Sequence, residues 1–105
     1  MIFNEDQTRD LVRRIVDAVH PRRIILFGSA ARGDAHSRSD IDILVEVPDG
    51  VHRRRTAQTI YRALAGYGIP VDIVVATETD MRLYGDVPGY VYREVVREGK
   101  ILYAA

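Results

Sequence analysis

The amino-acid sequence predicts one α/β (α+β) domain over residues 1–105, in which a small β-sheet is covered by helices. Short apolar runs that are typical of strands alternate with longer stretches of helical periodicity, and the length of the chain suits a single domain. The composition supports this fold class, because 47% apolar and 29% charged residues are typical of a folded protein rather than a disordered one.

Turn residues and apolar periodicity place the elements along the chain. In order, we expect a helix from Asn4 to His20, a strand at 23–27, a helical turn at 30–32, a strand at 40–47, a helix at 51–65, a strand at 71–76, a short helix at 80–83, a last helix opened by residues 86–88, and an edge strand at 101–103.

The first elements are bounded by a cap, a proline and a glycine. Asn4 and Gln7 have the spacing of a capping box, and Pro21 cannot continue the helix that they open. The strand at 23–27 is apolar at almost every position, as in the centre of a covered sheet, and Gly28 breaks it. The expected buried stripe of the first helix comprises Leu11, Val12, Ile15, Val16 and Val19.

Similar signals bound the later elements. Apolar residues alternate along 40–47, as in a half-buried strand, and a proline-glycine turn separates this strand from the next helix. Residues 66–70 break that helix, Thr77 or Thr79 caps a short one, and Gly99 closes the last. The expected core positions are Ile41, Ile43 and Val45 on the strand and Ala57, Ile60, Tyr61 and Leu64 on the helix.

Charge and composition exclude several classes of protein. Lys+Arg and Asp+Glu are both 15, and this zero net charge argues against a general binder of nucleic acid or anionic membranes. The absence of cysteine excludes disulfides and cysteine-ligated metal sites. No apolar run approaches the ~20 residues that span a bilayer, and the first residues lack the pattern of a signal peptide. We therefore expect a cytoplasmic protein.

Three aspartates stand where a small sheet normally buries apolar side chains. Asp40 and Asp42 are two residues apart on a strand, so their side chains leave the same face. Asp72 lies within an apolar strand and can face this pair if the two strands are neighbours. At an effective dielectric of ~20, two such charges ~6.5 Å apart repel by roughly 2.5 kcal/mol, so a cation between them is favoured. Mg²⁺ suits an all-oxygen site of this kind, and two ions would hold the attacking and leaving oxygens of a phosphoryl or nucleotidyl transfer.

Each of these residues, taken alone, has a simpler explanation. A single aspartate at a strand end is usually a loop cap or a salt-bridge partner, and nearby arginines could neutralise one or two of the three. That explanation leaves Asp72, inside an apolar strand, unaccounted for. Gly28 and Ser29 lie between a strand and a helical turn, where backbone N–H groups and a hydroxyl suit a phosphate, although such a pair is most often only a turn.

The spacing of these residues resembles a known family. A Gly-Ser pair at 28–29, ten further residues, an Asp-Ile-Asp run at 40–42 and a third aspartate at 72 resemble the nucleotidyltransferase superfamily of the DNA polymerase beta type. The resemblance implies the nucleotidyltransferase fold, a mixed sheet flanked by helices. The stretches that are similar to the minimal nucleotidyltransferase branch of this superfamily are 27–34, 39–45 and 97–103.

The resemblance also implies roles for individual residues. Asp40, Asp42 and Asp72 would be the catalytic residues. The first two would bind both Mg²⁺ ions, and Asp72 would bind the ion nearer the attacking hydroxyl and assist deprotonation of that hydroxyl. The Gly-Ser pair would hold the β- and γ-phosphates of ATP. The candidate nucleotide-binding residues are Gly28, Ser29, Arg32 and Ser39. The last two also have plainer explanations, as a surface ion-pair residue and a loop cap.

The same branch implies a protein partner. Minimal nucleotidyltransferases commonly act as antitoxins beside a helical HEPN-domain ribonuclease toxin, where they move AMP from ATP onto a toxin tyrosine and block the ribonuclease site. No segment of these 105 residues resembles an acceptor-binding domain, so we expect another protein to hold the acceptor. Two alternatives stay open: a small-molecule nucleotidyltransferase of the aminoglycoside-modifying kind, and a non-catalytic antitoxin that acts by occlusion.

Overall fold

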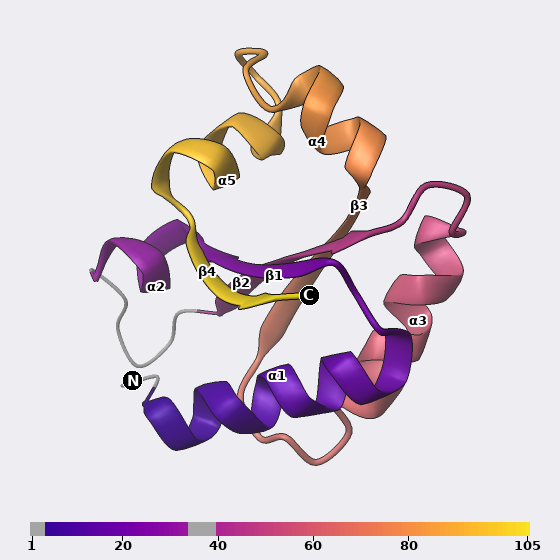
Figure 1. Ribbon diagram of the computed structural model, residues 1–105. Helices are drawn as coiled ribbons and strands as arrows, with labels where there is room; N and C mark the ends of the chain where they lie inside the picture. The colour runs from indigo at the N-terminus through magenta and orange to yellow at the C-terminus, as the bar shows by residue number, and fades with distance from the viewer. Residues whose placement is uncertain (1–3, 34–39) are drawn as a thin grey trace.

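In the computed structural model, four strands form one sheet and helices cover both of its faces (Figure 1). The structure describes residues 4–33 and 40–105, so the expected polar loop at 35–39, with Ser39, lies outside the described residues. Within these ranges, no helix is both long and apolar enough to cross a membrane. The elements are α1 (Glu5–Val19), β1 (Arg23–Phe27), α2 (Gly28–Arg32), β2 (Ile41–Val47), α3 (Arg53–Ala63), β3 (Val71–Thr77), α4 (Glu78–Tyr84), α5 (Val91–Glu98) and β4 (Lys100–Ala104).

The sheet is mixed, and its strand order is β3-β2-β1-β4. β1 pairs antiparallel with β2 on one side and with β4 on the other, whereas β2 and β3 run parallel. A parallel pair needs a long crossover connection, which α3 supplies. The expected edge strand at the C-terminal end is confirmed as β4, and β3 forms the opposite edge.

Alternation along the strands divides the core into two layers. α1 and α3 cover one face of the sheet, where Ile41, Ile43 and Val45 are buried as expected (Figure 1). α4 and α5 cover the other face, where Leu44 packs with Val95 of α5. Because successive side chains of a strand leave opposite faces, Asp42 lies on the same face as Leu44, toward α5.

The capping signals are confirmed. Asn4 Oδ1 accepts a hydrogen bond from the backbone N–H of Gln7 at 2.8 Å, and Gln7 Oε1 accepts one from the backbone N–H of Asn4 at 3.0 Å. Thr77, rather than Thr79, caps α4. These reciprocal bonds satisfy amide groups that have no partner within the helix, so local sequence is sufficient to fix where both helices begin.

Three expectations are wrong in detail. α2 begins at Gly28, two residues early, because the helix follows the last residue of β1, Phe27, without an intervening turn. α5 begins at Val91 rather than at 86–88, because Gly89 has a φ of +92° that no helix continues. Tyr61 is 46% exposed, and Thr56 occupies the buried position beside Ile60. The Tyr61 hydroxyl instead accepts a hydrogen bond from the N–H of Ile73 on the edge strand β3 at 2.9 Å.

Candidate active site

Two of the predicted carboxylates are paired across neighbouring strands. Asp42 on β2 and Asp72 on β3 are register partners in the parallel pair, so their side chains leave the same face of the sheet, toward α5. Asp42 is half-buried and Asp72 is exposed on the edge strand. Asp40 is exposed and directly precedes β2. The two strands are neighbours, which is the condition under which Asp72 can face Asp42.

The electrostatic environment of Asp42 shows that the acids interact. Burial raises the pKa of the Asp42 carboxyl, and the charges of Asp72 and Asp40 raise it further. Glu94 on α5 acts in the same direction, whereas Arg32 on α2 lowers the pKa. Proton binding relieves this repulsion, and so would a divalent cation among the carboxylates.

Gly28 brings backbone into direct contact with Asp42. It is the residue that follows β1 and opens α2, and its φ is +72°. A Cβ added at this position would lie 2.3 Å from Asp42 Oδ2, well inside van der Waals contact. Only glycine therefore permits both this left-handed backbone and this approach to the carboxylate.

Two of the other nucleotide-binding candidates lie on α2. Ser29 is half-buried in the first turn of α2. Arg32 ends the same helix, and its Nη1 lies 3.4 Å from Glu98 Oε2 of α5. Arg32 thus does make the ion pair that its plainer explanation requires, while its charge also acts on Asp42. Ser39 lies outside the described residues.

The donor atoms of these residues are of the kind that binds Mg²⁺, but the arrangement of the described side chains is not that of a complete metal site. Across residues 4–33 and 40–105, no three acidic or histidine side chains lie together as a ready metal-ligand group. The donors are nevertheless carboxylates, the ligands that Mg²⁺ prefers, and the pKa of Asp42 is raised first by burial and then by the negative charges of its acidic neighbours. The close approach of Gly28 adds a cradle beside Asp42 that a larger residue would fill.

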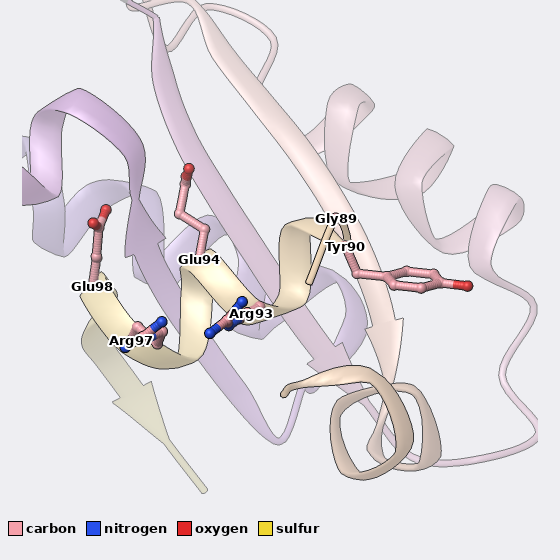
Figure 2. Close-up of a pocket in the computed structure, with 6 residues that line it drawn as sticks. All are labelled: Gly89, Tyr90, Arg93, Glu94, Arg97 and Glu98. Atoms are coloured by element: carbon pink, nitrogen blue, oxygen red, sulfur yellow. The ribbon is translucent and has the colours of Figure 1, made fainter. Parts of the chain in front are cut away.

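Sequence reasoning missed the part of the site that α5 supplies. Glu94 comes from a helix outside the motif, yet its charge acts on Asp42. It also lines a pocket of about 530 Å³ whose wall is α5 and the turn before it, formed by Gly89, Tyr90, Arg93, Glu94, Arg97 and Glu98 (Figure 2). Charged residues four apart on this helix were the only signal in the sequence that could have indicated it.

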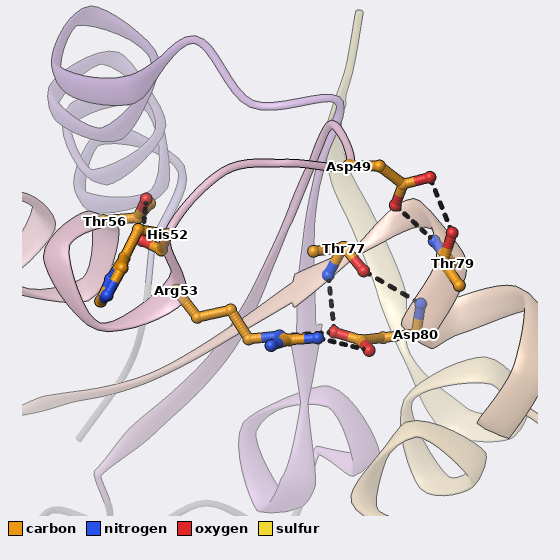
Figure 3. A network of polar contacts seen from close by, with 7 residues as sticks. All are labelled: Asp49, His52, Arg53, Thr56, Thr77, Thr79 and Asp80. Atoms are coloured by element: carbon orange, nitrogen blue, oxygen red, sulfur yellow. Dashed lines mark hydrogen bonds and ion pairs between the residues drawn. The ribbon is translucent and has the colours of Figure 1, made fainter.

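A second polar cluster lies at the other end of the sheet, where β3 ends at Thr77 (Figure 3). Asp80 is 7% exposed and accepts two hydrogen bonds from Arg53, from Nε and from Nη2, both at 2.8 Å. Its Oδ2 also accepts from the N–H of Thr77 at 2.9 Å, which closes the capping box of α4. Bonding to Arg53 is the main reason that the pKa of Asp80 is lowered. This cluster joins α3, β3 and α4, so we interpret it as structural.

Replacing Asp80 by asparagine is expected to lower the free energy of unfolding by about 2 kcal/mol, because the charge that bonds Arg53 is lost and one of the two accepting oxygens becomes an NH₂ group. A lowered pKa stabilises the fold above the ordinary value of 3.8, and this contribution is lost as the pH falls through the folded-state pKa. Urea unfolding of the wild type between pH 3 and 7 should show the loss, and Asp80→Asn should show less of it. Asp86→Asn, at an exposed aspartate, is the control, and equal pH dependence in all three proteins would contradict the interpretation.

The chain is similar in sequence and in structure to known proteins. A family model described as a nucleotidyltransferase domain matches residues 6–102. A protein of Methanocaldococcus jannaschii, described as a candidate protein adenylyltransferase, is 37% identical over 82 residues, which are 78% of each chain. A toxin–antitoxin crystal structure with AMP-PNP has 29% identity and a TM-score of 0.64, over 93% of this chain and 73% of that one. A tri-AMPylated HEPN toxin in complex with an MNT antitoxin, from Shewanella oneidensis, has 25% identity and a TM-score of 0.56, over 96% and 72%.

Proposed function

The chain belongs to the nucleotidyltransferase domain family, and from this premise we propose that it is a Mg²⁺-dependent protein adenylyltransferase. It transfers AMP from ATP to a tyrosine of a partner protein and releases pyrophosphate. The single observation that carries the proposal is the pairing of Asp42 with Asp72 on one face of the sheet, beside the bare backbone of Gly28. Because its donor is ATP, we expect the reaction to take place in the cytoplasm.

The proposed reaction forms one P–O bond and breaks another. The oxygen of the acceptor hydroxyl attacks the α-phosphorus of ATP, the bond from this phosphorus to the pyrophosphate oxygen breaks, and the hydroxyl loses its proton. Asp72 is suited to assist that proton transfer because its carboxylate is exposed on an edge strand, where a protein acceptor can reach it. Asp40, Asp42 and Asp72 would hold two Mg²⁺ ions, which when bound neutralise phosphate charge.

The nucleotide is assigned to the side of Asp42 on which α2 lies. Gly28 and Ser29 would hold the β- and γ-phosphates, since α2 starts at this pair directly beside the Asp42 carboxylate. Arg32 acts electrostatically on Asp42 and would add positive charge near the phosphates. Ser39 stays a nucleotide-binding candidate on the motif alone.

The proposed acceptor is a HEPN-domain toxin, with this chain as its antitoxin. The support is that chains similar to this one occur in toxin–antitoxin structures, one of them with AMP-PNP and one with a tri-AMPylated HEPN toxin. Each transferred AMP adds bulk and negative charge, which would oppose RNA binding at a ribonuclease site. Inactivation of the toxin would follow from these two effects.

ATP labelled at either its α- or its γ-phosphate tests the proposal. The purified protein is incubated with Mg²⁺ and an extract of the organism that carries the gene. We expect label from the α-phosphate in a protein, release of pyrophosphate, and no label with Asp42→Asn. Label from the γ-phosphate would contradict nucleotidyl transfer. Transfer to an aminoglycoside by the protein alone would favour a small-molecule enzyme, and toxin neutralisation by Asp42→Asn would favour occlusion.

A further inference from the structure

The pocket along α5 carries a row of positive charge that nothing in the described structure neutralises. Arg93 and Arg97 are one helical turn apart, and Figure 2 shows both on one side of α5, with Glu94 and Glu98 on the other. In the part of the chain that the structure describes, neither arginine makes an ion pair or a side-chain hydrogen bond, and Arg93 Nε is buried without a partner. Arg97 lies in the last turn of α5, where a positive charge stabilises the helix, but a second arginine four residues earlier adds like-charge repulsion.

The pocket borders the candidate active site. Glu98, on its wall, pairs with Arg32 of α2 at 3.4 Å, and Glu94 acts on the charge of Asp42. The two glutamates therefore lie between the arginine row and the catalytic carboxylates. A group bound by Arg93 and Arg97 would therefore lie along α5, with these glutamates between it and Asp42.

The positive charge of the two arginines determines which class of chemical group this pocket can bind. An unpartnered guanidinium row suits a carboxylate or phosphate. The triphosphate of ATP would concentrate several negative charges in one compact group beside two glutamates, whereas the carboxylates of a peptide bring one charge each and are spread along the chain. Acidic side chains of a protein acceptor are therefore the better fit, and Tyr90, 49% exposed at the same pocket, adds aromatic surface for a protein segment.

We propose that Arg93 and Arg97 form an acceptor-docking subsite that binds acidic side chains next to the tyrosine to be modified. This rests on the proposed function, because it names the part of the acceptor that the same site recognises. It assigns the two arginines a role in binding rather than in the chemical step.

Peptide binding tests the subsite without requiring turnover. The probes are a five-residue peptide with tyrosine between two pairs of glutamates and the same peptide with glutamines, each titrated in the absence of ATP. We expect the glutamate peptide to bind at least ~5-fold more tightly and to shift the NMR signals of the two guanidinium groups. The Arg93→Gln, Arg97→Gln double variant should lose this preference. Arg54→Gln with Arg55→Gln removes the same charge from two exposed arginines without ion pairs in the described structure, and it should keep the preference.

Three results would overturn the proposal. The first is equal binding of the two peptides to the wild type. The second is an equal loss of preference in the Arg54 and Arg55 control. The third concerns a non-hydrolysable ATP analogue. If the Arg93 and Arg97 variant bound this analogue more weakly by the same factor as it bound the peptide, the anion held by the two arginines would be the nucleotide. Exposed Arg97 replaced alone by glutamine guards against misfolding, and it should lose at least half of the preference. Failure of the transferase proposal would leave peptide binding unaffected.

Discussion

Replacing Asp42 by asparagine is expected to abolish AMP transfer while stabilising the folded protein. Activity should fall roughly 1,000-fold or more, because the variant loses a carboxylate at the centre of the proposed site. In buffer without divalent cations, the free energy of unfolding should rise by about 1 kcal/mol, since the cost of burying the Asp42 charge and its repulsion by Asp72 and Asp40 both disappear. A residue that costs stability and supplies activity is typical of a functional site.

The sign of the pH dependence makes this stability effect specific. The pKa of Asp42 is raised in the folded state above its ordinary value of 3.8, so ionised Asp42 destabilises the fold at neutral pH. The stability difference between Asp42→Asn and wild type should therefore be largest near pH 7, shrink as the pH falls through the raised pKa, and vanish below 3.8. Chemical unfolding across this range measures it, with Asp86→Asn as the control. A variant less stable than wild type at pH 7 would show that the carboxylate is structural.

Gly28→Ala is expected to damage both stability and activity. The left-handed backbone disfavours any Cβ, and this one would lie 2.3 Å from Asp42 Oδ2, so either the strand end or the carboxylate must move. We expect a loss of about 2 kcal/mol in the free energy of unfolding and of about 100-fold in AMP transfer. Thermal unfolding and the α-phosphate label measure the two effects.

Gly66→Ala separates backbone strain from the contact with Asp42. Gly66 has a φ of +78°, close to that of Gly28, but no described atom lies within 4 Å of the position of its Cβ. This variant should show a smaller loss of stability and full activity. If both glycine variants were equally active, the close approach of Gly28 to Asp42 would have no role in the reaction.

Local signals in the sequence were sufficient for most of the fold. The capping box at Asn4, the proline after α1 and the alternation in β2 each act within a few residues, and each predicts its element correctly. Tyr61 could not be placed in this way, because its exposure depends on its position over the edge strand β3. The start of α5 was misplaced because apolar spacing continues through a glycine whose φ is +92°.

The candidate site, too, could be predicted only in part from the sequence. Asp42 and Asp72 could be singled out from sequence because both lie in apolar strands, but it is the parallel register of β2 and β3 that places them opposite each other. Glu94 could not be predicted, because its effect on Asp42 depends on how α5 packs on the sheet. Tertiary packing of this kind leaves no local pattern, and charged residues on a helix usually indicate only a solvated face.

Calorimetry with Mg²⁺ and a non-hydrolysable ATP analogue tests the central claim, that these aspartates exist to hold a metal-bound nucleotide. The account predicts binding by the wild type at one site, a loss of binding when EDTA removes Mg²⁺, and at least ~10-fold weaker binding by Asp42→Asn and Asp72→Asn. The same affinity in the wild type and both variants, or in the presence and absence of Mg²⁺, would contradict it.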